Sequence, residues 1–424
     1  MERDGSFDLE ALESATKDVM LRCGAIALER LLEHEDGKGL NKTCACGGTF
    51  SVQKRAGKTI MTVMGPVRIT RTYQRCGDCG SRRVPEDSLL DVEKTGFSPG
   101  VRRIMAMTGA ELCFDKARNM IRNLARIEVT DKDVERTAEA IGADVARKEE
   151  QEMASAMADE LPASDEKPPI LYIAPDGTGV PVLRRETEGR KGKGADGIAR
   201  TREVKLGAIF TQTSKDKKGH PIRDPFSTSY VGKIENADEF GKRLYVEAQK
   251  RGLANAKMVV VIGDGAPWLW NLADLHFGKA LQILDYYHAS EHLCDLAKIL
   301  CPEDEMCRKR WLKPLLDYLW NGNIEKILAN LRSLKLRGKK KEITENTVNY
   351  FENNKNRMRY EEYRKKNLFI GSGVVEAGCK SVIGQRLKQS GMHWTVRGAN
   401  SIIALRCCIE SGNFESYWDS RRAA

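Results

Sequence analysis

The chain has 424 residues, of which 41% are hydrophobic and 31% are charged. This length predicts more than one domain, and this composition excludes a disordered chain because enough apolar residues are present to form buried cores. Lysine and arginine total 70 against 60 acidic residues, which gives a formal net charge of +10. Because acidic residues are so plentiful, the surface of the protein is not basic throughout. The excess of positive charge favours contact with a polyanion through selected surfaces.

The first residues and the apolar runs bear on location. Residues 1–13 (MERDGSFDLEALE) carry acids where a secretion signal has an apolar core. The longest sheet-like apolar run, residues 258–262, is far shorter than the roughly 18 residues of a membrane span. We therefore expect a cytoplasmic protein without membrane contact, whose 12 cysteines are reduced rather than joined in disulfides.

The N-terminal part of the chain changes character near residue 40. Residues 1–40 predict an N-terminal helix, because apolar residues recur at helical spacing and Asp8 can cap its start. Residues 41–95 instead contain two β-like runs, 59–64 and 67–73, around a Gly-Pro turn. This segment predicts a small β module.

A cysteine pair stands at each end of that module, with glycines beside it. The ligand pattern is Cys44-x-Cys46 followed by Cys76-x-x-Cys79. Four thiolates presented by two tight turns are the ligand set of a structural zinc site, so we expect a zinc ribbon. The alternative is four free cysteines. Basic residues nearby make the ribbon a plausible DNA-binding surface: Lys54, Arg55, Lys58, Arg68, Arg71, Arg75, Arg82 and Arg83.

The rest of the chain reads as an α/β core with helices before and inside it. Residues 96–165 predict a helical, helix-turn-helix-like DNA-binding region, with a helical connector as the alternative. Residues 166–300 predict the first part of the core, with strands at 170–173, 204–210, 227–231, 258–262 and 281–284 and a helix at 236–252. Residues 301–370 predict a helical insertion, and residues 371–424 complete the core with two helices.

Three acidic residues are candidates for a catalytic site. Asp176 and Asp264 follow predicted strands, and the carboxyl ends of such strands are where ligands bind in open α/β sheets. Glu376 lies on a predicted helix, on the face that also carries Ile383 and Leu387, so we expect that face to be largely buried. Each acid also has a structural alternative: an Asp-Gly turn, a helix cap and a surface ion pair, respectively.

Together the three acids indicate more than each one alone. One follows an early strand, one a later strand, and one lies on a helix after a long insertion. This order predicts a ribonuclease-H-like core, in which Asp176, Asp264 and Glu376 hold two Mg²⁺ or Mn²⁺ ions for phosphodiester chemistry.

Four segments carry a resemblance to a known family: DGTGVPV, GDGAPWLWN, LDYYHASEHL and GSGVVEAGCKSVIGQRLKQSGMHW. They resemble the D-D-E transposases of bacterial insertion sequences, in the Kra-type group related to the Mutator-like superfamily, over about residues 40–410. The resemblance implies that Asp176, Asp264 and Glu376 are catalytic. It also implies binding to terminal inverted repeats and to target DNA, strand cleavage, strand transfer, and at least a homodimer on double-stranded DNA.

Members of that superfamily carry a C/D-x-x-H element, which Asp285 and His288 match here. The resemblance places His288 near the active site, in contact with DNA or ordering a carboxylate. Without the resemblance, His288 and His292 could suggest a zinc-binding helix, but no third ligand is evident, and helix capping or packing is the alternative.

The basic residues around the glutamate cannot be carried over from the family. Where many such transposases have Tyr and Arg before the Glu and a Lys seven residues after it, this chain has Ser372, Gly373 and Ile383. Candidates for DNA contact are therefore taken from helix position, namely Lys380, Arg386 and Lys388.

Aromatic residues and other glutamates complete the set of candidates. Trp268, with Trp270 and Trp394, could stack on an unpaired base or pack in the core. Replacements for Glu376 would be Glu352, Glu361 and Glu362. The sequence thus predicts a transposase, with two alternatives: a domesticated transposase that binds DNA without cleaving it, or a ribonuclease-H-like nuclease.

Overall fold

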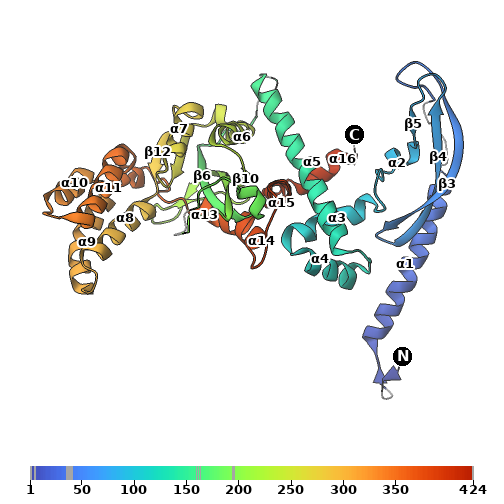
Figure 1. Ribbon diagram of the computed structural model, residues 1–424, viewed down its shortest axis with the longest axis horizontal. Helices are drawn as coiled ribbons and strands as arrows, with labels where there is room; N and C mark the ends of the chain where they lie inside the picture. The colour runs from blue at the N-terminus through green and yellow to red at the C-terminus, as the bar shows by residue number, and fades with distance from the viewer. Residues whose placement is uncertain are drawn as a thin grey trace. The chain divides into compact units, whose positions relative to one another are not determined.

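The computed structural model describes residues 2–3, 6–34, 42–158, 160, 162, 164–192 and 196–422. The chain divides into two compact units, Met1–Ala140 and Ile141–Ala424, whose elements are labelled in Figure 1. Within the described residues, no helix combines the length and the apolar character that crossing a membrane requires.

The first unit begins with a long helix packed on a β-hairpin. Helix α1 (Leu9–His34) starts where the Asp8 carboxylate accepts the Ala11 N–H at 3.0 Å, so the predicted cap is confirmed. Its Ala25, Leu28 and Leu32 pack on a small core of the hairpin. The hairpin and its neighbours are β3 (Phe50–Thr62), β4 (Gly65–Cys76), β5 (Arg82–Arg83) and α2 (Pro85–Leu89), and β1 (Glu2–Arg3) and β2 (Ser6–Phe7) form a separate pair before α1.

Short helices around a separate apolar core complete the first unit. They are α3 (Pro99–Glu111), α4 (Phe114–Met120), the π-helical η1 (Ile121–Ala125) and the start of α5 (Asp131–Met157). Met105, Ile121 and Val134 are buried together at the centre. The Ser98 hydroxyl caps α3 by accepting the Val101 N–H at 3.3 Å.

A five-stranded mixed sheet forms the centre of the second unit. The strands lie in the order β10-β7-β6-β11-β12; β10, β7 and β6 pair antiparallel, whereas β6, β11 and β12 pair parallel. Every predicted strand overlaps an observed one. Their bounds are β6 (Ile170–Pro181), β7 (Thr201–Gln212), β10 (Ser229–Lys233), β11 (Met258–Gly263) and β12 (Leu281–Leu284), with β8 (Ser214–Lys215) and β9 (Pro221–Ile222) as a separate pair.

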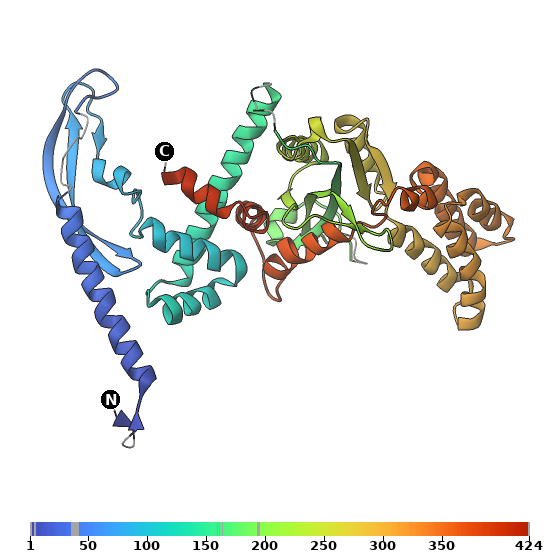
Figure 2. The ribbon, with the colours of Figure 1, turned by 180° about the vertical axis from the view of Figure 1, so that it is seen from behind.

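Helices cover both faces of this sheet (Figures 1 and 2). Gly207 of β7 faces Leu244 of α6, whereas its neighbour Leu206 faces Gly378 of α13. Successive residues of a strand point to opposite faces, so α6 and α13 cover different sides. The helices are α6 (Ala237–Lys250), α7 (Pro267–His276), α13 (Gly373–Gly378), the π-helical η5 (Cys379–Gly384), α14 (Gln385–Leu387), α15 (Val396–Glu410) and α16 (Phe414–Arg422).

The segment predicted as a helical insertion, residues 301–370, is helical and lies beyond the β12 edge of the sheet (Figure 2). It contains α9 (Glu305–Trp320), α10 (Ile324–Ser333), α11 (Gly338–Asn354), the short η4 (Lys355–Arg357) and α12 (Tyr360–Lys365), and it follows α8 (Tyr286–Leu300), which lies in the range that the sequence assigned to the core. Cys301 and Cys307, on either side of the turn between α8 and α9, form a disulfide. The expectation that all cysteines are reduced is therefore wrong at this pair, because the turn brings two thiols together that sequence spacing did not single out.

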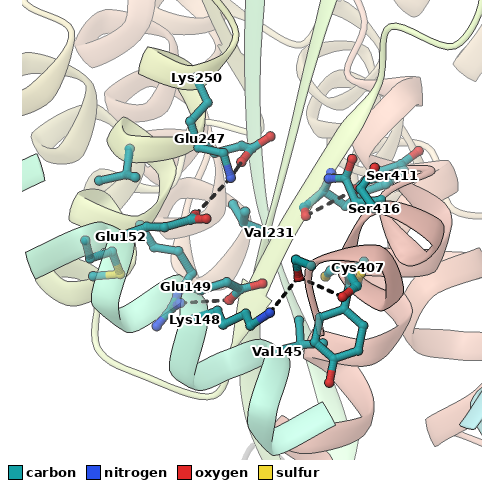
Figure 3. Close-up of a pocket in the computed structure, with 18 residues that line it drawn as sticks. Val145, Lys148, Glu149, Glu152, Val231, Glu247, Lys250, Cys407, Ser411 and Ser416 are labelled. Carbon is teal, nitrogen blue, oxygen red and sulfur yellow. Dashed lines mark hydrogen bonds and ion pairs between the residues drawn. The ribbon is translucent and has the colours of Figure 1, made fainter. Parts of the chain in front are cut away.

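Within the second unit, a row of ion pairs joins residues 149–152 of α5 to its neighbours. Its glutamates pair with basic residues of α6 and β10: Glu149 with Arg243 at 3.0 Å, Glu150 with Lys233 at 2.5 Å, and Glu152 with Lys250 at 2.9 Å. Figure 3 shows part of this row at the wall of a cavity of about 330 Å³ between α5, α6 and α15. These charges neutralise one another, so we assign this cavity a structural role.

A close crossing of α5 and α15 supplies a test of this packing. Gly142 of α5 lies against the backbone of Ser401 in α15. A Cβ added at Gly142 would overlap the Ser401 carbonyl oxygen. Gly142→Ala should lower the free energy of unfolding of the second unit by about 2 kcal/mol, since strain of overpacking outweighs the roughly 1 kcal/mol that alanine gains over glycine in a helix. Urea denaturation measures the change.

The matched control is Gly373→Ala, because Gly373 begins a helix of the same unit and a Cβ there would meet no atom within 4 Å. An equal loss of stability in both variants would contradict the packing described for α5 and α15.

Candidate active site

The candidate site lies where the parallel strands of the sheet end. Strand β6 pairs with β11 only as far as Ile173 and then continues to Pro181 beside β7 alone. Asp176 lies in this extension, opposite Leu206, and not after the end of a strand as the sequence predicted. Asp264 directly follows β11, as expected. Because the pairing of β6 with β11 ends at Ile173, Asp176 has β7 as its only strand neighbour among the described residues.

The three acidic residues line one pocket of about 280 Å³. They come from β6, from the end of β11 and from α13, so the chain brings together residues from three separate segments. The complete lining is Pro175, Asp176, Asp264, Tyr287, His288, Glu291, Ser372, Val375 and Glu376. The other glutamates considered from the sequence lie outside this lining, on α11 and α12, where each forms an ion pair: Glu352, Glu361 and Glu362.

Asp176 is half-buried. Its carboxylate accepts the Gly177 N–H at 2.6 Å and the Cys379 thiol at 3.3 Å. Burial raises the pKa of Asp176 above its ordinary value, and the negative charges of Asp264 and Glu376 raise it further. The three carboxylates therefore repel one another across the pocket, and a bound cation would relieve that repulsion.

Asp264 is oriented by its own turn. Its carboxylate accepts the Ala266 N–H at 3.0 Å, in the Asx-turn arrangement that precedes α7. Gly265 has a φ of 96°, which a side chain would strain. The Tyr350 hydroxyl of α11 donates to the backbone carbonyl of Asp264 at 3.3 Å. The Asp264 turn thus starts helix α7 and also places the Asp264 carboxylate in the pocket. Tyr350 of the helical insertion helps to hold this turn in place.

Glu376 is exposed, which corrects the expectation of a buried carboxylate. Ile383 and Leu387 are buried as predicted. The helical register changes between them because Cys379–Gly384 forms a π-helix, and each π-helical turn contains an additional residue. Glu376 consequently faces the pocket while the later residues face the core.

A buried arginine supports this irregular turn. The Arg406 guanidinium of α15 donates to the carbonyls of Ser381 and Val382, at 2.7 Å each, and pairs with Glu410 at 3.2 Å. Carbonyls displaced from regular helical bonding thereby keep a partner. Sequence reasoning did not identify Arg406, since nothing in a helical pattern announces a π-helical turn.

Asp285 connects the glutamate helix to the strand ends. One carboxylate oxygen caps α8 by accepting the N–H groups of Tyr287 at 2.6 Å and His288 at 2.9 Å. The other oxygen accepts the Ser372 N–H at 2.5 Å and the Ser372 hydroxyl. The Ser372 hydroxyl also lies 2.9 Å from the Glu376 carboxylate. Asp285 is 1% exposed, so it acts inside the protein and not at a DNA-facing surface.

Ser372 was not recognised as a site residue from the sequence. The predicted helix began at residue 371, whereas α13 begins at Gly373, so Ser372 occupies the N-cap position without making a side-chain cap bond. Here its side chain bonds to Asp285 and to Glu376.

His288 lies in the pocket, and the zinc-helix alternative finds no support. His288 is 3.7 Å from the Glu291 carboxylate and packs edge-on against His292, which stacks on Tyr350 at 3.9 Å. Across the described part of the chain, the only group of ligand atoms arranged for one metal ion is a cysteine cluster. The histidines thus pack with aromatic neighbours.

The three basic residues considered for DNA contact differ in their exposure to solvent. Lys380 and Lys388 are exposed, and Lys388 donates to the Thr178 hydroxyl at 2.5 Å, on the strand of Asp176. Arg386 is 0% exposed and lies over the Trp394 ring at 5.0 Å. It therefore presents no surface to DNA, which corrects the choice made from helix position.

The positions of the tryptophans favour packing inside the protein over stacking on a DNA base. Trp268 is partly exposed and carries the Lys205 ammonium 4.8 Å from its ring centre. Trp270 and Trp394 are buried, as the core-packing alternative predicts.

The four clustered cysteines form a second site, in the first unit. The sulfurs of Cys44, Cys46, Cys76 and Cys79 all lie within 4.8 Å of one another. Gly47 and Gly80 adopt positive φ values of 87° and 72°, which lets each turn point two thiols inward. Hydrogen bonding with Ser81 lowers the pKa of the Cys79 thiol below its ordinary value. The cluster could hold one metal ion.

Comparisons with known proteins add little to this geometry. No known family model and no curated protein sequence matches the chain. One solved structure, the Drosophila P element transposase strand transfer complex, is similar over 77% of this chain and 81% of that chain, with 9% identity and a TM-score of 0.26. Likeness this low carries no argument about function, so the resemblance to insertion-sequence transposases rests on the sequence segments.

The role of Asp285 can be tested by stability. Asp285→Ala removes a helix cap worth about 1 kcal/mol and leaves several buried N–H groups without an acceptor, so we expect a loss of about 3 kcal/mol in unfolding free energy. Asp304→Ala is the matched control, because Asp304 caps α9 through a single exposed bond, to the Cys307 N–H at 2.9 Å. It should cost only about 1 kcal/mol. Equal losses would show that the bonds to Ser372 contribute nothing.

Proposed function

We propose that this protein is a D-D-E transposase of an insertion sequence, which cleaves DNA at the element ends and transfers the strands to target DNA. The observation that carries the proposal is the convergence of Asp176, Asp264 and Glu376 on one pocket. The sheet also supports the expected ribonuclease-H-like core, since three antiparallel strands are followed by two strands parallel to the first. In this proposal the first unit and the start of α5 bind the inverted repeats.

The pocket offers ligands of the kind that divalent metal ions bind, although its three carboxylates are not gathered as closely as the sulfurs of the cysteine cluster. Its three carboxylates supply the oxygen ligands that Mg²⁺ and Mn²⁺ prefer. Asp176 has a raised pKa from burial and from its acidic neighbours, which is the electrostatic environment a cation would stabilise. Two ions held by Asp176, Asp264 and Glu376 would activate the attacking oxygen and stabilise the leaving oxygen of a phosphodiester.

The chain's own residues have distinct roles in this proposal. Asp285 and Ser372 fix the start of α13 and thereby the position of Glu376. The Cys379 thiol and the Gly177 N–H orient the Asp176 carboxylate. His288, at the pocket wall, would contact the phosphate backbone of the bound strand. Two element ends must be held together for joining, so we propose at least a homodimer on double-stranded DNA.

The acids give the direct test. Each of Asp176→Asn, Asp264→Asn and Glu376→Gln keeps side-chain size and removes the charge that holds the ions, so each should abolish both cleavage and strand joining. The measurement is cleavage and joining of a labelled inverted-repeat duplex with Mg²⁺ or Mn²⁺, with a gel shift to show that DNA binding is retained. Asp176→Asn should also raise thermal stability at neutral pH without metal, because a raised folded-state pKa destabilises the folded state above the unfolded-state pKa.

Glu291→Gln is the matched control for these variants. Glu291 lines the same pocket but is not one of the three acids, so most activity should remain. Full cleavage by any one of the three acid variants would remove that residue from the triad. Cleavage without joining by the unaltered protein would instead indicate a nuclease, and binding without cleavage would indicate a non-cleaving DNA-binding protein.

We propose further that the cysteine cluster binds one structural zinc ion. Four thiol ligands and tight turns suit tetrahedral Zn²⁺, whose binding would stabilise a β module with a small core. Metal analysis of the purified protein should give about one zinc per chain. The double variant Cys76→Ser with Cys79→Ser should lose the zinc, weaken DNA binding and leave the second unit folded.

Cys23→Ser is the control for zinc content, because Cys23 is an exposed thiol outside the cluster. Zinc retained in full by the double variant would place the ligands elsewhere.

A further inference from the structure

A groove of about 580 Å³ runs along the three-stranded sheet of the first unit. It is separate from the cysteine cluster, although β4 ends at Cys76 and β5 begins shortly after Cys79. Its lining contains five basic residues, two acids, two glutamines and one tyrosine: Gln53, Lys54, Tyr73, Gln74, Arg75, Arg82, Arg83, Val84, Asp87, Glu93 and Lys94.

The charge of the groove favours an anionic ligand. Asp87, one of its two acids, is buried and already paired with two cations outside the groove lining, Lys58 at 3.5 Å and Arg71 at 3.1 Å. The five basic side chains of the lining therefore outweigh the remaining acid, Glu93. A row of cations along a β-ribbon is the arrangement that neutralises the phosphates of a nucleic acid.

One glutamine is directed by a β-bulge. Val52 of β3 pairs with Gln74, and Lys54 pairs with Tyr73, so Gln53 is an extra residue without a cross-strand partner, and its amide donates to the Ser51 hydroxyl at 3.1 Å. Bulges re-aim a side chain relative to the regular strand. Gln53 is exposed and lies in the groove lining. A glutamine amide can bond in a bidentate way to the major-groove edge of adenine.

The neighbouring side chains are held in place before any ligand binds. Arg83 donates from Nε to the Gln74 amide oxygen at 2.9 Å, and its guanidinium lies 3.9 Å from the centre of the Phe50 ring. The Lys54 ammonium lies 4.8 Å from the centre of the Tyr73 ring. Side chains ordered in advance lose less conformational entropy on binding.

We propose that this groove reads the base sequence of duplex DNA in the major groove, with Gln53 contacting a base and Arg75, Arg82 and Lys94 contacting phosphates. The major groove of B-form DNA admits a two-stranded β-ribbon, whereas that of double-stranded RNA is too narrow for side chains to read. The proposal rests on the proposed function only in taking DNA as the partner, and it does not require cleavage.

The experiment is a binding selection by the full-length, zinc-loaded protein from a pool of randomised DNA duplexes. The unaltered protein should select a defined sequence that contains an adenine. Gln53→Ala should lose about tenfold in discrimination at that position alone, the scale of one bidentate base contact. Arg82→Ala should weaken binding to all sequences and lower the salt dependence by about one phosphate contact. Both residues are exposed, so neither change removes a buried contact.

Lys54→Ala and Arg55→Ala form a matched pair. They are neighbours on β3, both exposed and both basic, but only Lys54 lines the groove. Lys54→Ala should weaken binding several-fold, whereas Arg55→Ala should weaken it less and leave the selected sequence unchanged. An equal loss in both would overturn the assignment to the groove.

Three further results would overturn the proposal. They are selection of no defined sequence by the unaltered protein, selection of the same sequence with the same discrimination by Gln53→Ala, and tighter binding to single-stranded DNA or to double-stranded RNA of the same length. Failure of cleavage would contradict the proposed function and leave this inference standing. Normal cleavage together with unchanged selection by Gln53→Ala would contradict this inference and leave the proposed function standing.

Discussion

The candidate active site depends on one buried carboxylate. Asp285 follows β12, caps α8 and accepts two hydrogen bonds from Ser372, which is 87 residues further along the chain. Its own N–H donates to the Gly263 carbonyl at 2.8 Å, directly before Asp264. The aspartate of β11 and the glutamate helix are thereby held to the same strand end. A buried charge is costly unless hydrogen-bonded, and here every bond of Asp285 also fixes part of the pocket.

Much of the second unit could be predicted because its local patterns are strong. The apolar runs of β11 and β12 and the cap of α6 at Asn236 follow directly from residue type. The exposure of Glu376 and the burial of Arg386 could not be predicted, since both follow from the π-helical turn and from Arg406, a residue of another helix. Tertiary contacts, unlike caps and apolar runs, leave no periodic trace in the sequence.

In the first unit the paired cysteines were informative because metal-ligand spacing is a local property of the chain. The groove could not be inferred from the sequence, because it depends on which residues face each other across β3 and β4. The register change at Gln53 is a property of the pairing, and neither strand alone reveals it. The sequence therefore indicated a basic module and left the arrangement of its side chains open.

The two ends of the helical insertion lie next to each other, which affects how the insertion can vary in length. The Tyr286 N–H donates to the Ile370 carbonyl at 2.8 Å, next to the contacts between Asp285 and Ser372, so the insertion leaves and rejoins the core at one point. The entropy of closing a loop grows only slowly with its length. Helices between these two positions can accordingly be lengthened, shortened or exchanged between relatives at small cost, provided that the support from Tyr350 is preserved. Diversity in this lineage is thus expected to concentrate there, while the strand ends stay constant.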